Sequence, residues 1–212
     1  MPRLTIDFFH DVVCGWCFNI SPRLRALADE FDLAVHHRTF VLQDSRERMI
    51  EVWGSIAAAK ETILGHWEAC RRASDTPELF NLDGMRAAPF EYPFGLPAAL
   101  ACKAAERIGG PAAHWDMFDR LQKAHITEAR NVADPEVLIS IAKEAWYDPA
   151  HFSEVMAEFG TRRAVERDRQ YAHRLQVRSV PTLVVRETGA RLINGPVEDL
   201  RAQLRVALKL VA

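Results

Sequence analysis

Residues 14–17 are Cys14-Gly15-Trp16-Cys17. They follow a short apolar run, Leu4 to Phe9, and precede a segment from Asn19 to Phe31 in which apolar residues recur every three or four positions. The run is typical of a buried strand, and the segment is typical of a helix with one core-facing side. Two cysteines separated by two residues at a strand-to-helix junction predict a dithiol with redox chemistry.

The two sulfurs are expected to have different roles. The first turn of a helix offers unpaired N–H groups and the positive end of the macrodipole, which favour a thiolate at Cys14. Cys14 is therefore the predicted attacking sulfur, and Cys17 the sulfur that resolves a mixed disulfide. The alternatives are a structural cysteine pair or half of a zinc site. No second C-x-x-C or closely spaced histidine pair completes a zinc site, so we expect no metal.

Composition excludes several classes of partner. The chain has 212 residues, of which 49% are hydrophobic and 26% charged, and its net charge is -2. A globular protein with no basic excess for nucleic acid is expected. No apolar run approaches the roughly 20 residues that cross a bilayer, and the chain enters its first strand almost at once, which predicts a cytoplasmic protein without a membrane partner.

The order of the remaining elements predicts an α/β fold with a helical insertion. A second strand within residues 33–42 would complete a parallel strand-helix-strand unit. Helical patterns follow: one long helix or two meeting near Gly54 or Gly65, a proline-rich loop over 77–97, and further helices to about Leu175. Strands at 182–185 and 191–194 predict a hairpin, followed by a last helix. We expect a sheet-bearing domain of residues 1–43 and 150–212, and a helical insertion domain of residues 44–149.

Three motifs in this order resemble the thioredoxin fold: the C-x-x-C unit, Pro22 in the first helix, and Val180-Pro181-Thr182 before a strand. The inserted helices resemble the DsbA-like branch, especially FrnE-type oxidoreductases and 2-hydroxychromene-2-carboxylate isomerases. The segments Asp11-Val12-Val13-Cys14 and 38–42 are similar to parts of that group. The resemblance implies a cis Val180–Pro181 peptide beside the cysteines, with the main chain of Val180 available to an extended substrate.

The chain also departs from this group. Proline commonly follows the first cysteine there, whereas Gly15 does so here. The isomerases have serine in place of Cys14 and depend on glutathione. Many thioredoxin-fold proteins carry an acidic residue where this chain has Phe8, and Asp7 and Asp11 are the candidates to replace it.

The sequence therefore predicts a thiol-disulfide oxidoreductase that acts on protein or small-molecule thiols and disulfides. It has no tightly bound cofactor, with glutathione a candidate co-substrate. Two alternatives stay open: a glutathione-dependent isomerase or transferase acting on a small aromatic substrate, and a non-catalytic binding protein or chaperone.

Other side chains have both a functional and a structural interpretation. Trp16 should be partly exposed beside the substrate, and Phe90 and Tyr92 either line a groove over the dithiol or pack in the core. His10 is a candidate, with Asp11, to tune the thiol, but a solvated loop histidine is the simpler interpretation. His36 and His37 are interpreted as a surface pair, and no role is assigned to the remaining histidines. Cys70 and Cys102 are expected to be buried, inert thiols.

Overall fold

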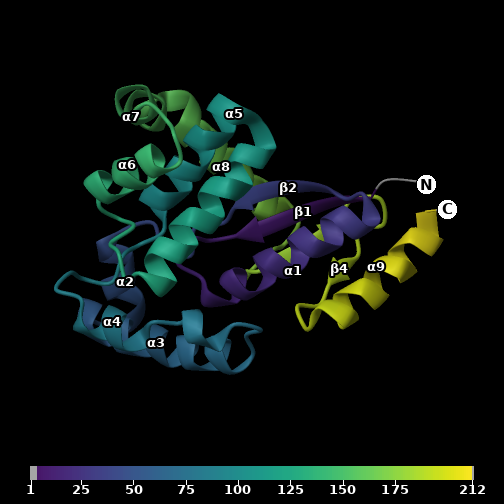
Figure 1. Cartoon of the computed structure of the whole chain (residues 1–212), viewed down its shortest axis with the longest axis horizontal. Helices are drawn as coiled ribbons and strands as arrows, with labels where there is room; N and C mark the ends of the chain where they lie inside the picture. Colours follow the sequence, from purple (N-terminus) through teal and green to yellow (C-terminus); the bar gives the residue numbers. More distant parts are fainter. Residues whose placement is uncertain (1–3, 212) are drawn as a thin grey trace.

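The computed structural model describes residues 4–211, and within them the sheet has four strands in the order β2-β1-β3-β4. Strand β1 (Thr5–His10) pairs in parallel with β2 (Ala34–Thr39) and antiparallel with β3 (Thr182–Val185). Strand β4 (Arg191–Leu192) pairs antiparallel with β3. The predicted parallel unit and the predicted hairpin are both confirmed (Figure 1).

Helix α1 (Gly15–Phe31) connects β1 to β2 and contains Pro22, as predicted. Cys14 occupies its N-cap, so the dithiol spans the junction between strand and helix. The last helix, α9 (Val197–Val211), packs against α1. The dithiol segment is therefore anchored by the central strand on one side and by a packed helix on the other.

The two faces of the sheet are covered by different helices. Phe8 packs edge-on against Phe118 of α5 and shares a core with residues of α1 and α9. Phe9, the next residue of β1, packs against Tyr171 of α8 and against Val184. Because successive side chains of a strand point to opposite faces, β1 is buried on both, as its apolar sequence predicted.

The helices between β2 and β3 form a block that lies mostly at one end of the sheet (Figure 1), and α5 and α8 of this block pack against the strands. Its elements are α2 (Arg46–Trp53), α3 (Ile56–Arg72), the short helix η1 (Pro77–Leu79), α4 (Leu82–Ala87), α5 (Leu96–Gln122), the π-turn η2 (Lys123–Thr127), α6 (Pro135–Glu144), α7 (Pro149–Ala157) and α8 (Phe159–Arg174).

The helix boundaries follow the sequence signals closely. The predicted break near Gly54 separates α2 from α3, because that residue takes a left-handed φ of 80°. Gly110 likewise interrupts α5 with φ 80° and ψ -170°. The proline-rich stretch 77–97 is not a loop throughout, since it contains η1 and α4. The division into domains 1–43 with 150–212 and 44–149 stays a prediction.

None of the helices in the described part of the chain is both long and apolar enough to span a bilayer.

Candidate active site

Cys14 lies at the point where α1 meets the loop before β3. Its sulfur accepts a hydrogen bond from the N–H of Cys17 at 3.4 Å, and its thiol faces the carbonyl oxygen of Val180 at 3.6 Å. The Val180–Pro181 peptide is cis, as the resemblance implied. The chain thus brings together residues 14 and 180, which are 166 positions apart. Cys14 is 7% exposed, so only a small part of the residue contacts solvent.

Cys17 lies one turn deeper in α1 and is fully buried. Burial and the adjacent Cys14 sulfur raise the pKa of the Cys17 thiol well above its ordinary value, and the charge of Asp11 adds to this rise. A neutral thiol is a poor nucleophile. Cys17 therefore needs a nearby proton acceptor before it can attack a disulfide.

Asp11 is the acidic side chain that the fold places near this thiol. Its carboxylate accepts hydrogen bonds from the backbone N–H groups of Leu42 at 2.6 Å and Val13 at 3.3 Å. Burial raises the pKa of Asp11 in spite of these bonds. Asp7, the other candidate, is held by Arg38 at 2.8 Å and Arg186 at 2.6 Å. Of the two carboxylates, Asp11 is the one whose charge acts on the Cys17 thiol.

Two side chains from the insertion fix the backbone around the dithiol. Gln122, at the end of α5, donates from Nε2 to the carbonyl oxygens of Val12 at 3.2 Å and Cys14 at 3.1 Å. The Tyr92 hydroxyl donates to the carbonyl of Val13 at 3.4 Å and contacts Nε2 of His125 at 3.0 Å. No local sequence pattern indicated Gln122, because its partners lie more than 100 positions away.

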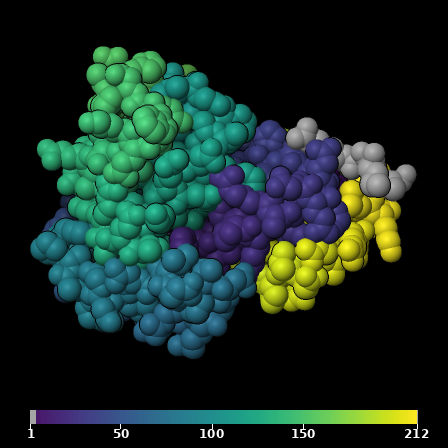
Figure 2. All heavy atoms as spheres, in the orientation of Figure 1, coloured from purple at the N-terminus to yellow at the C-terminus, as the bar shows by residue number. Residues whose placement is uncertain are grey.

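A cavity of about 280 Å³ opens beside the Cys14 sulfur. Strand ends, the dithiol loop and helices α2 and α3 contribute its walls, most of which are apolar. The lining residues are Val13, Cys14, Gly15, Trp16, Leu42, Gln43, Met49, Trp53, Ile63, His66, Trp67, Cys70, Tyr92, Pro93 and Val180. In Figure 2 the purple segment that carries the dithiol lies between the blue and green helical block and the yellow helix α9.

The aromatic side chains singled out from the sequence are placed differently. Trp16 is 37% exposed and lines the cavity, and Tyr92 lines it while being almost fully buried. Phe90 lies outside the lining and packs against the core, with the Lys60 ammonium 5.9 Å from its ring centroid. A larger hollow of about 540 Å³ lies along Phe18 and Pro22 of α1, but neither cysteine of the dithiol lines it.

The other two cysteines are buried, as predicted. Burial raises the pKa of Cys102, which lies inside α5, and raises the pKa of Cys70 to about 12. Cys70 nevertheless lines the active-site cavity, from α3, which the sequence did not indicate. Its sulfur lies 3.0 Å from the position that a Cβ on Gly15 would occupy.

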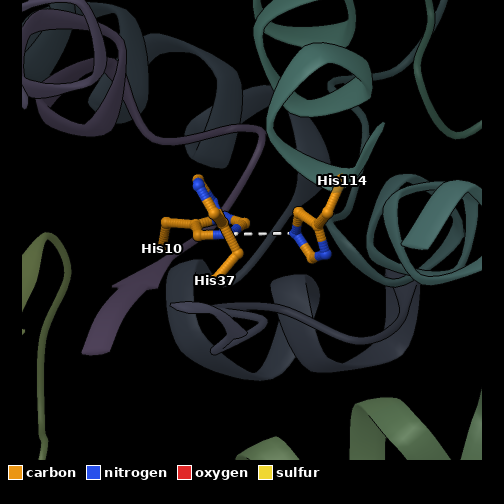
Figure 3. Close-up of side chains that lie close together, drawn as sticks. All are labelled: His10, His37 and His114. Atoms are coloured by element: carbon orange, nitrogen blue, oxygen red, sulfur yellow. Dashed lines mark hydrogen bonds between the residues drawn. The ribbon is translucent and has the colours of Figure 1, made fainter. Parts of the chain in front are cut away.

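The interpretation of two histidines was wrong. His10 is not in a solvated loop: it is the last residue of β1 and is 1% exposed. His37 is 4% exposed rather than part of a surface pair, because its side chain points to the core side of β2, whereas that of His36 is half-buried. The rings of His10, His37 and His114 lie together, and Nε2 of the His10 ring contacts a nitrogen of each of the other two rings (Figure 3).

Comparisons with known proteins agree with this architecture. The family model described as thioredoxin matches residues 8–201. The ClpXP adapter protein SpxH of Shouchella clausii is 27% identical over 183 residues, which make up 85% of this chain and 57% of that protein. The chain therefore spans just over half the length of this curated relative.

Solved structures with the same fold cover nearly the whole chain. A candidate protein disulfide isomerase from Nitrosomonas europaea superposes with a TM-score of 0.81 and 20% identity, covering 100% of both chains. The cytosolic disulfide reductase DsbM of Pseudomonas aeruginosa, in its structure with glutathione, superposes with a TM-score of 0.78 and 23% identity, covering 97% of this chain and 100% of that one. These likenesses show the fold, including its helical insertion.

Proposed function

The chain belongs to the thioredoxin family, and from this premise we propose that it is a thiol-disulfide oxidoreductase that acts through Cys14 and Cys17. The observation that carries the proposal is the position of the Cys14 sulfur. It caps α1, accepts the N–H of Cys17, and faces the Val180 carbonyl at the mouth of an apolar cavity. Thiol-disulfide exchange begins at a sulfur that the substrate can reach, and Cys14 is 7% exposed whereas Cys17 is fully buried.

In the proposed first step, the Cys14 thiolate attacks one sulfur of a substrate disulfide. The substrate S–S bond breaks, a mixed disulfide with Cys14 forms, and the other substrate sulfur leaves as a thiolate that takes up a proton. The cavity walls would hold an apolar group next to the reacting sulfur, and the main chain at Val180 would align an extended substrate.

In the second step, Cys17 attacks the Cys14 sulfur. Asp11 accepts the Cys17 proton, the bond between Cys14 and the substrate sulfur breaks as a Cys14–Cys17 disulfide forms, and the second substrate sulfur leaves as a thiolate that takes this proton from Asp11. The substrate has gained two electrons and the enzyme has lost two. The raised pKa of the Cys17 thiol explains why this step requires a base, and the raised pKa of Asp11 suits it to accept and return a proton.

We propose reduction as the net direction, with two molecules of glutathione restoring the dithiol and leaving as glutathione disulfide. Support comes from the fold shared with DsbM, which is a cytosolic disulfide reductase and was solved with glutathione. A cytosolic glutathione pool keeps thiols reduced, and would drive the cycle in this direction.

The test is turnover of a disulfide-bonded protein substrate with glutathione, compared among the wild type, Cys17→Ser and the double variant Cys14→Ser/Cys17→Ser. We expect the wild type to turn over and Cys17→Ser to stop as a mixed disulfide that non-reducing electrophoresis detects. Full activity of Cys17→Ser with glutathione would instead support the isomerase or transferase alternative. Activity of the double variant in preventing aggregation, without turnover by the wild type, would support a chaperone. A reduction potential near that of a strong oxidant would contradict the proposed direction.

A further inference from the structure

Three fully buried histidines from distant parts of the chain meet on the sheet (Figure 3). His10 comes from the end of β1, His37 from β2 and His114 from α5. Nε2 of His10 lies 3.2 Å from Nδ1 of His37 and 3.2 Å from Nε2 of His114. One nitrogen from each ring lies within 4.8 Å of the other two, so three potential ligand atoms surround a common point.

The three neutral rings have too few protons for both close contacts of the His10 Nε2 to be hydrogen bonds. Nδ1 of His114 contacts a carboxylate oxygen of Glu106 at 2.7 Å, which fixes the proton on Nδ1 and leaves Nε2 with a lone pair. If His10 donates its Nε2–H to Nε2 of His114, the same Nε2 has no second proton to donate to Nδ1 of His37 and no lone pair to accept one. If His37 donates to His10 instead, the lone pairs of His10 and His114 face each other at 3.2 Å. Only one of the two contacts can therefore be a full hydrogen bond between neutral rings.

We propose that His10, His37 and His114 form a binding site for a divalent transition-metal ion of the Zn²⁺ type. A cation at the common point would accept all three lone pairs and remove the mismatch. Tetrahedral Zn²⁺ with Zn–N bonds of about 2.0–2.1 Å separates its ligand nitrogens by about 3.3 Å, and two of the three separations here are 3.2 Å. Three imidazoles leave a fourth coordination position open, as in the zinc sites that have three histidine ligands.

The surroundings supply an outer shell for such an ion. Metal-bound histidines commonly donate their second N–H to a carboxylate, as His114 does to Glu106. Glu106 and Asp168 are both held by the Lys103 ammonium, at 2.7 and 2.6 Å. Nδ1 of His10 and Nε2 of His37 have no hydrogen-bond partner among residues 4–211. Each can therefore carry the ring proton while the other nitrogen of the same ring binds the metal.

The site is separate from the proposed redox reaction and does not depend on it. It would join β1, β2 and α5 through one ion, and His10 is four residues before Cys14. An ion bound only by the folded chain stabilises it, so the melting temperature should rise with Zn²⁺ concentration.

The experiment uses Cys14→Ser/Cys17→Ser, which removes the dithiol as a competing zinc ligand. Zn²⁺ binding is measured by competition with a chromophoric chelator, and the ligand atoms are identified by X-ray absorption at the zinc edge. We expect one Zn²⁺ per chain, with nitrogen or oxygen neighbours at about 2.0–2.1 Å and no sulfur at about 2.3 Å.

Variants in the same background locate the site. His37→Asn places an amide where Nδ1 lies and should abolish binding, whereas His36→Asn, its neighbour in β2, should leave it unchanged. Glu106→Gln should weaken binding about 10- to 100-fold.

Three results would overturn the proposal: no Zn²⁺ bound by the dithiol-free protein, sulfur among the zinc neighbours, or unchanged affinity in His37→Asn. If His37→Asn does not fold, the X-ray absorption spectrum of the folded parent decides between a histidine site and a thiolate site. The two differ in the atoms bound to zinc and in their distances from it.

Discussion

Gly15 is the residue at which the dithiol segment is most tightly enclosed, and Gly15→Ala tests that packing. A Cβ there would lie 3.0 Å from the Cys70 sulfur, 3.3 Å from the Cys70 Cβ and 3.3 Å from a ring carbon of Phe80. Ordinary contacts between such atoms are 3.4 Å or longer. Since Cys70 and Phe80 are both buried, neither can move away into solvent.

The expected change in the free energy of unfolding follows from two opposing effects. Alanine in place of glycine normally stabilises a helix by about 0.5–1 kcal/mol. Crowding in a well-packed core costs about 1–3 kcal/mol. Gly15→Ala should therefore lower the free energy of unfolding by about 1 kcal/mol, which corresponds to roughly 2–4 °C in Tm for a chain of this size.

The assay is a double-mutant cycle with Cys70→Ala, measured by urea denaturation. Removing the Cys70 sulfur removes the shortest contact, so Gly15→Ala should cost less in that background or become stabilising, with a coupling energy of about 1 kcal/mol. Gly65→Ala in α3 is the matched control, because a Cβ there meets nothing within 4 Å and should stabilise. Additive effects of Gly15→Ala and Cys70→Ala, or stabilisation by Gly15→Ala alone, would refute the argument.

Three further substitutions test other contacts around the site. Asp7→Asn should cost about 2–3 kcal/mol at neutral pH, because it removes charge-assisted hydrogen bonds such as that to Arg186. Burial opposes ionisation of Asp7, but its arginine and tyrosine partners outweigh burial and lower its pKa. The stabilisation by Asp7 is therefore present above its ordinary pKa of 3.8 and is lost as the pH falls through the lower pKa of the folded state, so the stabilities of wild type and variant should converge in acid. Urea denaturation at several pH values measures this convergence. A difference in free energy of unfolding that stays constant with pH would contradict it. Gly95→Ala places a Cβ 2.4 Å from a carboxylate oxygen of Asp11 and should slow the second, Cys17-dependent step in single-turnover measurements, whereas an unchanged rate would argue against a role for that carboxylate. Tyr92→Phe removes the hydroxyl that holds the dithiol loop and should cost about 1 kcal/mol by thermal denaturation with substrate affinity unchanged; no loss of stability would show that this hydrogen bond contributes nothing.

Local signals were enough to predict much of the fold. The C-x-x-C unit marked the junction of β1 and α1, and Gly54 marked the break between α2 and α3. Each of these signals depends on the conformational preference of one or two residues, which does not require knowledge of the rest of the chain. The short helix α4 was missed because the surrounding prolines suggested a loop.

The environment of the site could not be predicted in the same way. Burial of His10 and His37 depends on α5 covering the sheet, and their meeting with His114 spans up to 104 positions. The hydrogen bonds of Gln122 to the dithiol loop and the approach of Cys70 to Gly15 also join segments that are far apart in the sequence.

The amino-acid sequence by itself determined where the dithiol is, which elements flank it, and which cysteine begins a helix. Only the tertiary structure decided what surrounds those sulfurs and which polar side chains are buried together. The physical reason is that backbone preferences act between near neighbours, whereas burial, and the pKa shifts and hydrogen bonds that follow from it, depend on which distant segments pack against each residue.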